Sequence, residues 1–584
     1  MKSVVRYSLS SIAGAISLVL LQTQVAHAAG IATPSMSVSA LGTANSNAAA
    51  IHDPSAQYAN PASLTRFTGL QVAGAMLVAD ASIDFENDGS TTVYNHDQGG
   101  TPIEGGDAGD PVKPTPIPQT YVSYQFSDDL FFGLAIDAPY AIQGDFNDNW
   151  IGRYDGTESQ IAALNFNPSI AWKFNRQLSF GFGATAEVMS VKMTRATDLI
   201  AGVTGTVNTA GRDLKAIFAN RISESTSCAL SNDFNPLALN NEGFTFDAAC
   251  ANSGAKDQLG FAINAIDGLT SKVNDALSPL VETNNYENDS RLDIEGIDVA
   301  FGFNMGMMYE PWIGQRFGLS YRSKIVHELT VETDWTVNEK AHQKALEDKD
   351  GVFLGNDAVN LVVNGLQVAE IVNTLLSDQL FTDGEADLEF TTPAVASFHT
   401  YHQLNDRLSL MSDLTWTQWS AVQNLQINFD NQLKDGVAVL AFEDVWRFSL
   451  GGEFQYTPRL SLRAGYAIDQ SPSPKGKRNP GLPDSDRQVF SFGANYMLGK
   501  NETIDFGFSW IAFEDSRVDY NDYGGNDLPA PVLAVSDIVA DLGLDVSDYQ
   551  GVGLVPTTTT NNHTTSGTFK STAYLVGIQY NRRF

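Results

Sequence analysis

The sequence predicts an all-β protein, a 14-stranded antiparallel transmembrane β-barrel with helical insertions in its long loops. Three observations lead to this prediction. Strand-length segments alternate apolar residues with small or polar ones, connections alternate between short and long, and an N-terminal export signal is followed by no apolar run of helix-spanning length. Transmembrane β-barrels combine alternating strands with unequal connections, and they need no apolar helix because paired strands satisfy their own backbone.

The first 28 residues predict the export signal. Lys2 and Arg6 form a positive start, residues 12–21 form an apolar stretch, and Ala26-His27-Ala28 is a small-x-small cleavage site. An uncleaved membrane anchor is the alternative, but the apolar run is short and ends at the cleavage pattern. We therefore expect 1–28 to be a signal peptide and the chain to be periplasmic, secreted or an outer-membrane barrel.

Alternation is clearest at the C-terminal end, where large apolar residues share one face of the run 574–584 and smaller, more polar residues share the other. The runs 441–457 and 504–510 repeat the pattern. A soluble β-sandwich also alternates, but it rarely places aromatic residues on one face and Arg, Glu and Gln on the other over such lengths. The pattern therefore favours a barrel whose apolar face meets lipid.

Fourteen segments have this character, and an even number places both termini on the periplasmic side. A barrel of this size has a lumen wide enough to need something inside it. Short turns such as 127–129 and 457–459 alternate with long loops. The predicted strands are 69–84, 119–126, 130–140, 159–174, 178–194, 293–310, 315–335, 388–403, 407–417, 441–456, 460–470, 487–498, 502–516 and 568–584.

Composition excludes several classes of protein. The chain has 584 residues with 35 Lys and Arg against 68 Asp and Glu, a formal net charge of −33, which argues against a nucleic-acid partner. An aromatic fraction of 10% argues against an acidic disordered chain. This length would imply several soluble domains, since one soluble core stops growing near ~250–300 residues, whereas a barrel closes around a lumen. Much of the acidity lies in predicted external loops such as 84–110 and 514–527.

Two long insertions, 195–292 and 336–387, are not strand-like. Apolar residues recur at helical spacing over 259–277 and 359–375, which predicts helices in external loops. These helices either pack on the barrel rim or together form an apolar groove for a ligand. Cys228 and Cys250, the two cysteines of the chain, predict one disulfide within the first insertion, with two unpaired cysteines as the alternative.

Enzyme motifs are missing from the sequence. It contains neither Gly-x-Ser-x-Gly nor His-Glu-x-x-His. His399 and His402, three apart on a predicted strand, point to opposite faces and cannot bind one metal ion together. The sequence thus predicts no catalytic residue, no metal site and no cofactor.

Several segments resemble, in the same order, the FadL-type outer-membrane transporters of long-chain fatty acids and hydrocarbons. The first is Asn60-Pro61-Ala62, which is similar to the Asn-Pro-Ala motif of the family's N-terminal plug. The terminal Phe584 is similar to the assembly signal of outer-membrane proteins. The other similar segments are 150–154 (WIGRY), 321–325 (YRSKI), 416–419 (WTQW) and 482–487 (LPDSDR).

The resemblance implies a monomer in the bacterial outer membrane, in contact with its lipid and lipopolysaccharide. Residues 29–68 would form a hatch in the lumen, and 69–584 the barrel. Hydrophobic small molecules, fatty acids or hydrocarbons, would be captured by external loops, pass through the lumen and leave sideways into the bilayer. Such passive uptake helps an apolar molecule that water and a polysaccharide-covered surface hold back. A general porin and an adhesin are the competing interpretations.

The sideways exit would lie at a kink in the third strand, for which Ala138-Pro139-Tyr140 supplies a local cause. Proline removes a ladder donor and is confined to strand edges and bulges. From spacing alone Pro139 could equally mark the end of the strand, and the resemblance favours the kink. The family often has glycine where this chain has Ala141.

A ligand carboxylate would need a cation in the lumen. The resemblance implies this role for Arg195, at the end of the fifth predicted strand. Arg322 and Lys324 are predicted to point inward on the seventh strand, either in an ion-pair network of the wall or in contact with ligand. A second family cation has no counterpart, because residues 435–441 contain neither Lys nor Arg and Lys434 is the nearest substitute. This departure leaves room for neutral aromatic or alkane hydrocarbons.

Overall fold

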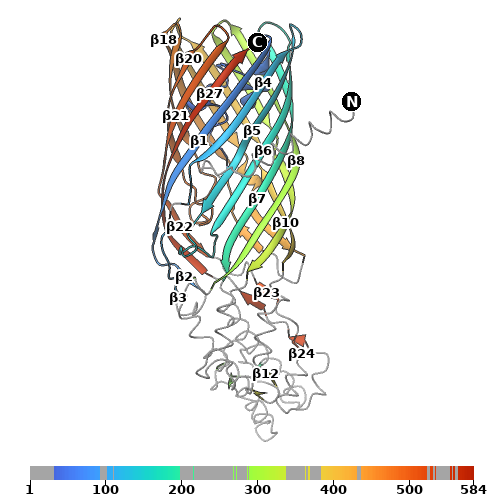
Figure 1. Ribbon diagram of the computed structural model, residues 1–584, viewed down its shortest axis with the longest axis vertical. Helices are drawn as coiled ribbons and strands as arrows, with labels where there is room; N and C mark the ends of the chain where they lie inside the picture. Colours follow the sequence, from blue (N-terminus) through green and yellow to red (C-terminus); the bar gives the residue numbers. More distant parts are fainter. Residues whose placement is uncertain are drawn as a thin grey trace, which may run out of the picture.

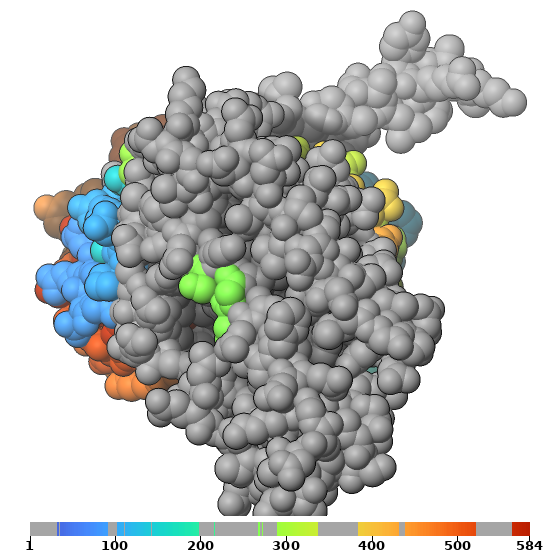
Figure 2. All heavy atoms as spheres, turned by 90° about the horizontal axis from the view of Figure 1, so that it is seen from below, coloured from blue at the N-terminus to red at the C-terminus, as the bar shows by residue number. Residues whose placement is uncertain are grey.

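The computed structural model describes residues 32–33, 35–92, 101–109, 111–197, 289–336, 383–430, 436–521 and 563–584, together with isolated residues and short strands between these ranges. The described residues form one closed antiparallel β-barrel (Figure 1). Strand β1 (Leu70–Asn87) pairs with β27 (His563–Arg583) from Gln71 opposite Arg583 to Asn87 opposite Gly567, and this pairing closes the barrel. In Figure 2, a view from below, blue residues near the start of the chain accordingly lie beside red and orange residues near its end.

The wall has the fourteen strands that the sequence predicts, counted over the described residues. Five of them are interrupted and carry two labels each. Between β1 and β27 the wall consists of β4 (Thr115–Gln125), β5 (Leu130–Asp145), β6 (Glu158–Lys173), β7 (Leu178–Thr197), β8 (Ser290–Trp312), β9 and β10 (Gln315–Arg322, Ile325–Thr336), β13 and β14 (Gly384–Thr392, Val395–Gln403), β15 and β16 (Leu408–Thr417, Asn424–Phe429), β17 and β18 (Gly436–Val439, Val445–Thr457), β19 (Leu460–Asp469), β20 (Arg487–Met497), and β21 with β22 (Glu502–Phe513, Ser516–Asn521).

The short strands β2 and β3 (Thr91–Thr92, Thr101–Pro102) pair with each other, and β2 also pairs with β27, so both belong to the sheet of the wall. Among the described residues three further pairs form separate two-stranded sheets. They are β11 with β12 (Val362–Val363, Leu366–Gln367), β23 with β26 (Asp527–Pro529, Thr557–Thr559) and β24 with β25 (Leu533–Ala534, Gly553–Leu554).

The alternation in the sequence becomes two faces of the wall. On β27, Tyr574 and Val576 are 44% and 56% exposed on the outer face, whereas Leu575 between them is fully buried. Exposed apolar side chains recur in this way around the barrel, which is the band that a transmembrane barrel presents to lipid.

Residues 35–68, which we call the luminal segment, pack against the inner face of the wall. They contain helix α2 (Val38–Leu41), helix α3 (Ala56–Ala59) and a 3-10 helix, η1 (Pro61–Arg66). Helix α2 contacts β20, β21 and β27, while η1 contacts β5 to β8 on another part of the wall. The segment therefore reaches wall strands that are far apart in the sequence.

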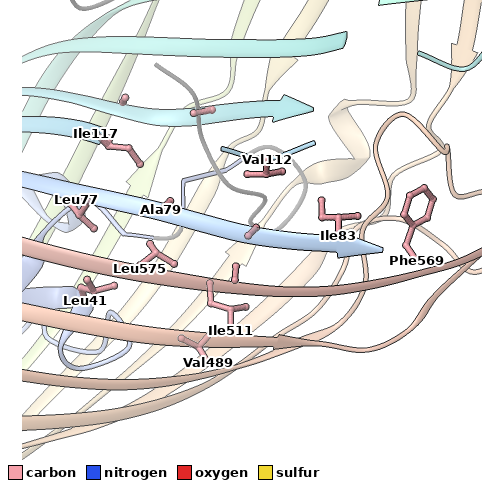
Figure 3. Packing of buried hydrophobic residues seen from close by; sticks show 14 of the residues in the cluster. Leu41, Leu77, Ala79, Ile83, Val112, Ile117, Val489, Ile511, Phe569 and Leu575 are labelled. Atoms are coloured by element: carbon pink, nitrogen blue, oxygen red, sulfur yellow. The ribbon is translucent and has the colours of Figure 1, made fainter. Parts of the chain in front are cut away.

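Apolar residues of the luminal segment and the wall share a core. Figure 3 shows Leu41 of helix α2 among Leu77 of β1, Val489 of β20, Ile511 of β21 and Leu575 of β27. All of these side chains are buried. Burial of apolar surface, at roughly 25 cal/mol per Å², holds the segment against the wall.

Several predictions fall largely outside the described residues. These are the signal peptide, the Cys228–Cys250 pairing and most of the insertions 195–292 and 336–387. In the first insertion Asp267, Gly268 and Ser271 are helical. No helix among the described residues is long and apolar enough to cross a membrane.

The helix predicted over 359–375 is wrong where it can be checked. Val362–Val363 and Leu366–Gln367 instead form an antiparallel strand pair, β11 with β12. The sequence between the two strands is Asn364-Gly365, a dipeptide favoured in two-residue hairpin loops. This local turn preference explains why helical apolar spacing did not produce a helix there.

Candidate functional site: the lumen and the wall at strand β5

Strands β4 and β5 are paired along only part of their length. The ladder runs from Gln125 opposite Phe131 to Thr120 opposite Ile136 and then stops, among the residues described. Contact resumes beyond the strand, where the Asp145 N–H donates to the Pro111 carbonyl at 2.8 Å and Lys113 Nζ lies 2.8 Å from Asp145 Oδ2. Between these points lie Thr115–Gln119 of β4 and residues 137–144 of β5, which we call the unpaired stretch.

Strand β5 has a bulge at the start of the unpaired stretch. Its pairing with β6 continues on both sides, but the register shifts between Asp137 and Tyr140, which are opposite Asn165 and Ala163. An extra residue on one strand of a pair bends that strand. The structure thus places Ala138, Pro139, Tyr140 and Ala141, the residues predicted for a kink, at and just after the register shift.

Residues 32–33 meet the bulge from inside the barrel. The Thr33 N–H donates to the Pro139 carbonyl at 2.8 Å, and the Thr33 hydroxyl donates to the Ala138 carbonyl at 2.7 Å. Ala32 forms an isolated bridge with Tyr140. These contacts satisfy carbonyls that an interrupted ladder leaves without strand partners.

The Asn-Pro-Ala sequence anchors the luminal segment to the wall. The Asn60 side-chain carbonyl accepts the Ala62 N–H at 3.0 Å and caps η1, which begins at Pro61. The Asn60 side-chain amide then donates to the carbonyls of Met307 and Leu319, each at 3.1 Å. One buried asparagine therefore ties the segment to both β8 and β9.

Glycines of the inner wall make room for the luminal segment. A Cβ on Gly465 would lie 2.2 Å from the Thr43 carbonyl carbon, and one on Gly181 would lie 2.4 Å from the Ala62 nitrogen. Sequence reasoning missed these positions, although a glycine inside a strand is a sign of close backbone approach. The wall glycines whose Cβ would lie within 3 Å of the segment are Gly133, Gly181, Gly306, Gly451, Gly465, Gly493, Gly507 and Gly577.

A cavity of about 230 Å³ lies between the luminal segment and the wall strands β8, β9, β14, β15 and β18. Arg322 lines it. Its Nη2 donates to the Tyr58 carbonyl at 3.0 Å, and its guanidinium lies 4.4 Å from the centre of the Tyr58 ring. Nη1 has no hydrogen-bond partner among the described residues. Burial raises the pKa of Tyr58 to about 12, against the opposing effect of Arg322, so its hydroxyl is neutral at physiological pH.

Another side of the cavity carries a hydrogen-bonded row of Ser320, His399 and Asp413. Ser320 Oγ lies 3.0 Å from His399 Nε2, and His399 Nδ1 pairs with Asp413. Hydrolases use this order of side chains, and here the row lines the cavity between the luminal segment and the wall. Sequence motifs could not reveal the row, because its members come from β9, β14 and β15.

The predicted cations do not gather at one place. Arg195 lies half-buried near the outer end of β7, opposite Leu292 of β8. Arg322 faces the lumen. The expectation that Lys324 shares its face is wrong, because Lys324 is exposed between the buried Ser323 and Ile325.

A one-residue insertion explains the position of Lys324. Asn304 of β8 is opposite Arg322, whereas Gly296 is opposite Val331, so eight steps along β8 match nine along the neighbouring strand. The Ser323 hydroxyl accepts the Phe303 N–H at 3.0 Å at this point. A slip of one residue moves every later side chain to the other face.

Comparison with known proteins places the chain in a family. Residues 19–230 and 243–584 match the family described as "Outer membrane protein transport protein (OMPP1/FadL/TodX)". Outer membrane protein P1 of Haemophilus influenzae is 24% identical over 84% of this chain and 88% of its own. The long-chain fatty acid transport protein of Escherichia coli K12 is 23% identical over 87% of this chain and 93% of its own.

A solved structure supports the fold. The crystal structure of a Pseudomonas aeruginosa FadL homologue matches 95% of this chain and 99% of its own, with a TM-score of 0.65 and 18% identity. Family members are transporters and channels, not enzymes. The chain therefore belongs to the OMPP1/FadL/TodX family and is an outer-membrane β-barrel transporter for hydrophobic compounds.

Proposed function

We propose that this protein takes up long-chain fatty acids by passive passage: external loops capture the ligand, the lumen conducts it, and the wall releases it sideways at the bulge in β5. The unpaired stretch carries this proposal. Backbone groups without partners in lipid cost several kcal/mol each, so a long interruption in a membrane barrel ladder needs a purpose or a compensating partner.

The luminal segment favours a lateral exit over an axial one. It acts as the hatch in this proposal, because eight wall glycines let it pack closely against β5, β7, β8, β18, β19, β20, β21 and β27. A ligand moving along the barrel axis would have to displace these contacts and the Asn60 bonds. At the unpaired stretch it would meet no strand ladder.

Arg322 supports a carboxylate ligand, because its Nη1 has no described partner beside the cavity. A charge-assisted hydrogen bond is stronger where water is scarce. Arg195, as part of the same proposal, meets the carboxylate earlier, near the outer end of the wall. Lys324 is not part of it.

Uptake of aromatic or alkane hydrocarbons is the second candidate, favoured by the lack of Lys and Arg in residues 435–441. That the protein works as a monomer and contacts lipopolysaccharide remains a prediction.

The test measures uptake of radiolabelled oleate and toluene in a transporter-deficient strain that expresses the protein. Wild type is compared with a variant that lacks Pro139 and so loses the extra residue of β5. Heat-modifiable gel mobility confirms that equal amounts of both barrels fold. We expect wild type to raise oleate uptake more than toluene uptake, and the variant to lose the gain. If wild type accelerates neither ligand, the transport proposal fails; if the variant transports like wild type, the lateral exit fails.

A further inference from the structure

The β4 part of the unpaired stretch contains two prolines at alternate positions, Pro116 and Pro118, and Pro114 precedes the strand. Their rings are on the outer face, where Pro116 is exposed and Pro118 half-buried. Proline has no N–H and cannot donate to a strand ladder. What matters is the neighbour toward which the missing N–H groups would point.

Hydrogen bonds at the other end of β4 answer this question. The Gln125 N–H donates to the Gly69 carbonyl on the β1 side, and the next N–H, of Phe126, donates to the Leu130 carbonyl on the β5 side, each at 3.0 Å. Successive residues of a strand direct their backbone groups to opposite neighbours, and β4 stays in unbroken register with β1 from Thr115 to Tyr124. Even-numbered residues of β4 therefore direct their backbone groups toward β5. Pro116 and Pro118 are even-numbered, so β4 lacks two N–H donors on the side that faces β5.

At another proline of the wall, a side-chain hydrogen bond replaces the backbone bond that proline cannot form. Pro168 of β6 lies on the outer face within a continuous sheet, between Phe166 opposite Ala186 and Ser169 opposite Gly183 of β7. The side-chain amide of Asn167 donates to the Ala184 carbonyl at 3.0 Å, which replaces the bond that Pro168 cannot form. Among the described residues no such replacement joins Pro116 or Pro118 to β5.

We propose that Pro116 and Pro118 form a donor-free edge that keeps β4 from pairing with β5 beyond the bulge. This inference deepens the proposed function, on which it rests, by assigning the other side of the lateral exit. The bulge shifts the register of β5, and the prolines leave β4 without N–H groups that would pair with β5 or remain unsatisfied in lipid. The exit is therefore built from both strands.

The test restores the donors while leaving the bulge intact, in the variant Pro116→Val/Pro118→Val. The matched control is Pro168→Val, also a lipid-facing strand proline. Amide hydrogen exchange of the purified proteins in lipid nanodiscs is followed in a peptide covering 137–145, together with oleate uptake in cells. We expect the double variant to slow exchange in this peptide several-fold and to lower uptake, and the control to change neither.

Exchange and uptake separate the two ideas. Exchange at 137–145 as fast as in wild type overturns the donor-free edge, whatever the uptake. Slower exchange with unchanged uptake supports the edge but overturns the lateral exit. Absence of uptake by wild type overturns the proposed function and leaves the exchange result to decide the inference. If the double variant does not fold, Pro118→Val alone is tested in the same way, because position 118 adjoins the last pair of the ladder, Thr120 opposite Ile136.

Discussion

Gly42 of the luminal segment and Gly493 of β20 meet backbone to backbone: a Cβ on Gly42 would lie 2.9 Å from the Gly493 Cα. Real Cβ atoms do not approach other atoms so closely, so neither position accepts a side chain without movement. The segment is thus fitted to the wall by the absence of side chains as much as by apolar contact.

Gly465→Val should dislodge the luminal segment, because its Cβ would meet the Thr43 backbone at 2.2 Å. Overpacking of this kind costs about 1–3 kcal/mol. We expect a lower urea midpoint for unfolding from lipid vesicles and a higher ion conductance in planar bilayers. Gly74→Val is the control, since a Cβ on Gly74 meets nothing within 4 Å. Equal effects of the two substitutions would contradict close packing at Gly465.

Thr33→Val should loosen the contact between residues 32–33 and the bulge of β5. It removes the hydroxyl bond to the Ala138 carbonyl and keeps the N–H bond to Pro139. A net hydrogen bond contributes about 0.5–1.5 kcal/mol, which corresponds to a roughly two- to tenfold shift in an equilibrium. If this contact closes the exit from inside, oleate uptake rises by about that factor. A fall in uptake, with Thr68→Val unchanged as the exposed control, would show instead that Thr33 supports the exit.

The strands could be predicted because the wall repeats one physical requirement, an apolar outer face against a smaller or polar inner face. The same period hid the interruptions. Strands β9 and β10 each alternate regularly, before and after Ser323 and Lys324. The extra residue between them only exchanges which positions face inward, so the sequence pattern does not reveal it. The register against β8 and the exposure of Lys324 show that Arg322 and Lys324 point in opposite directions.

The cavity could be predicted only in part. Asn60-Pro61-Ala62 was recognised by its resemblance to a family motif, and the structure shows that it forms a helix start with an asparagine cap and a following proline. The row Ser320, His399 and Asp413 depends on which residues of three strands lie side by side, as His399 does with Gly318 and Asp413. The register between strands that are distant in the sequence cannot be predicted from the sequence of either strand alone.

Arg322→Gln should weaken binding of a carboxylate ligand more than that of a neutral one. Hydrogen bonds to charged groups contribute about 1.5–3 kcal/mol, so the Kd for oleate should rise about ten- to a hundredfold, while the Kd for methyl oleate changes little. Binding is measured on purified protein in detergent. Lys324→Gln is the control, because Lys324 is exposed two residues away. Equal losses for both ligands would mean that Arg322 only holds Tyr58 in place.

Arg463→Met should destabilise the barrel strongly. The Arg463 side chain is 3% exposed and bonds Glu453 and Asp505, each at 2.6 Å, so its removal leaves two carboxylates close together without their cation. Breaking a buried ion pair from one side costs about 3–5 kcal/mol. The urea midpoint for unfolding from vesicles should fall accordingly. Adding Asp505→Asn should recover part of the loss, because it removes one carboxylate that no longer has a cation beside it. Arg459→Met, at an exposed turn, controls for loss of an arginine; a midpoint equal to that of this control would show that the network does not stabilise the wall.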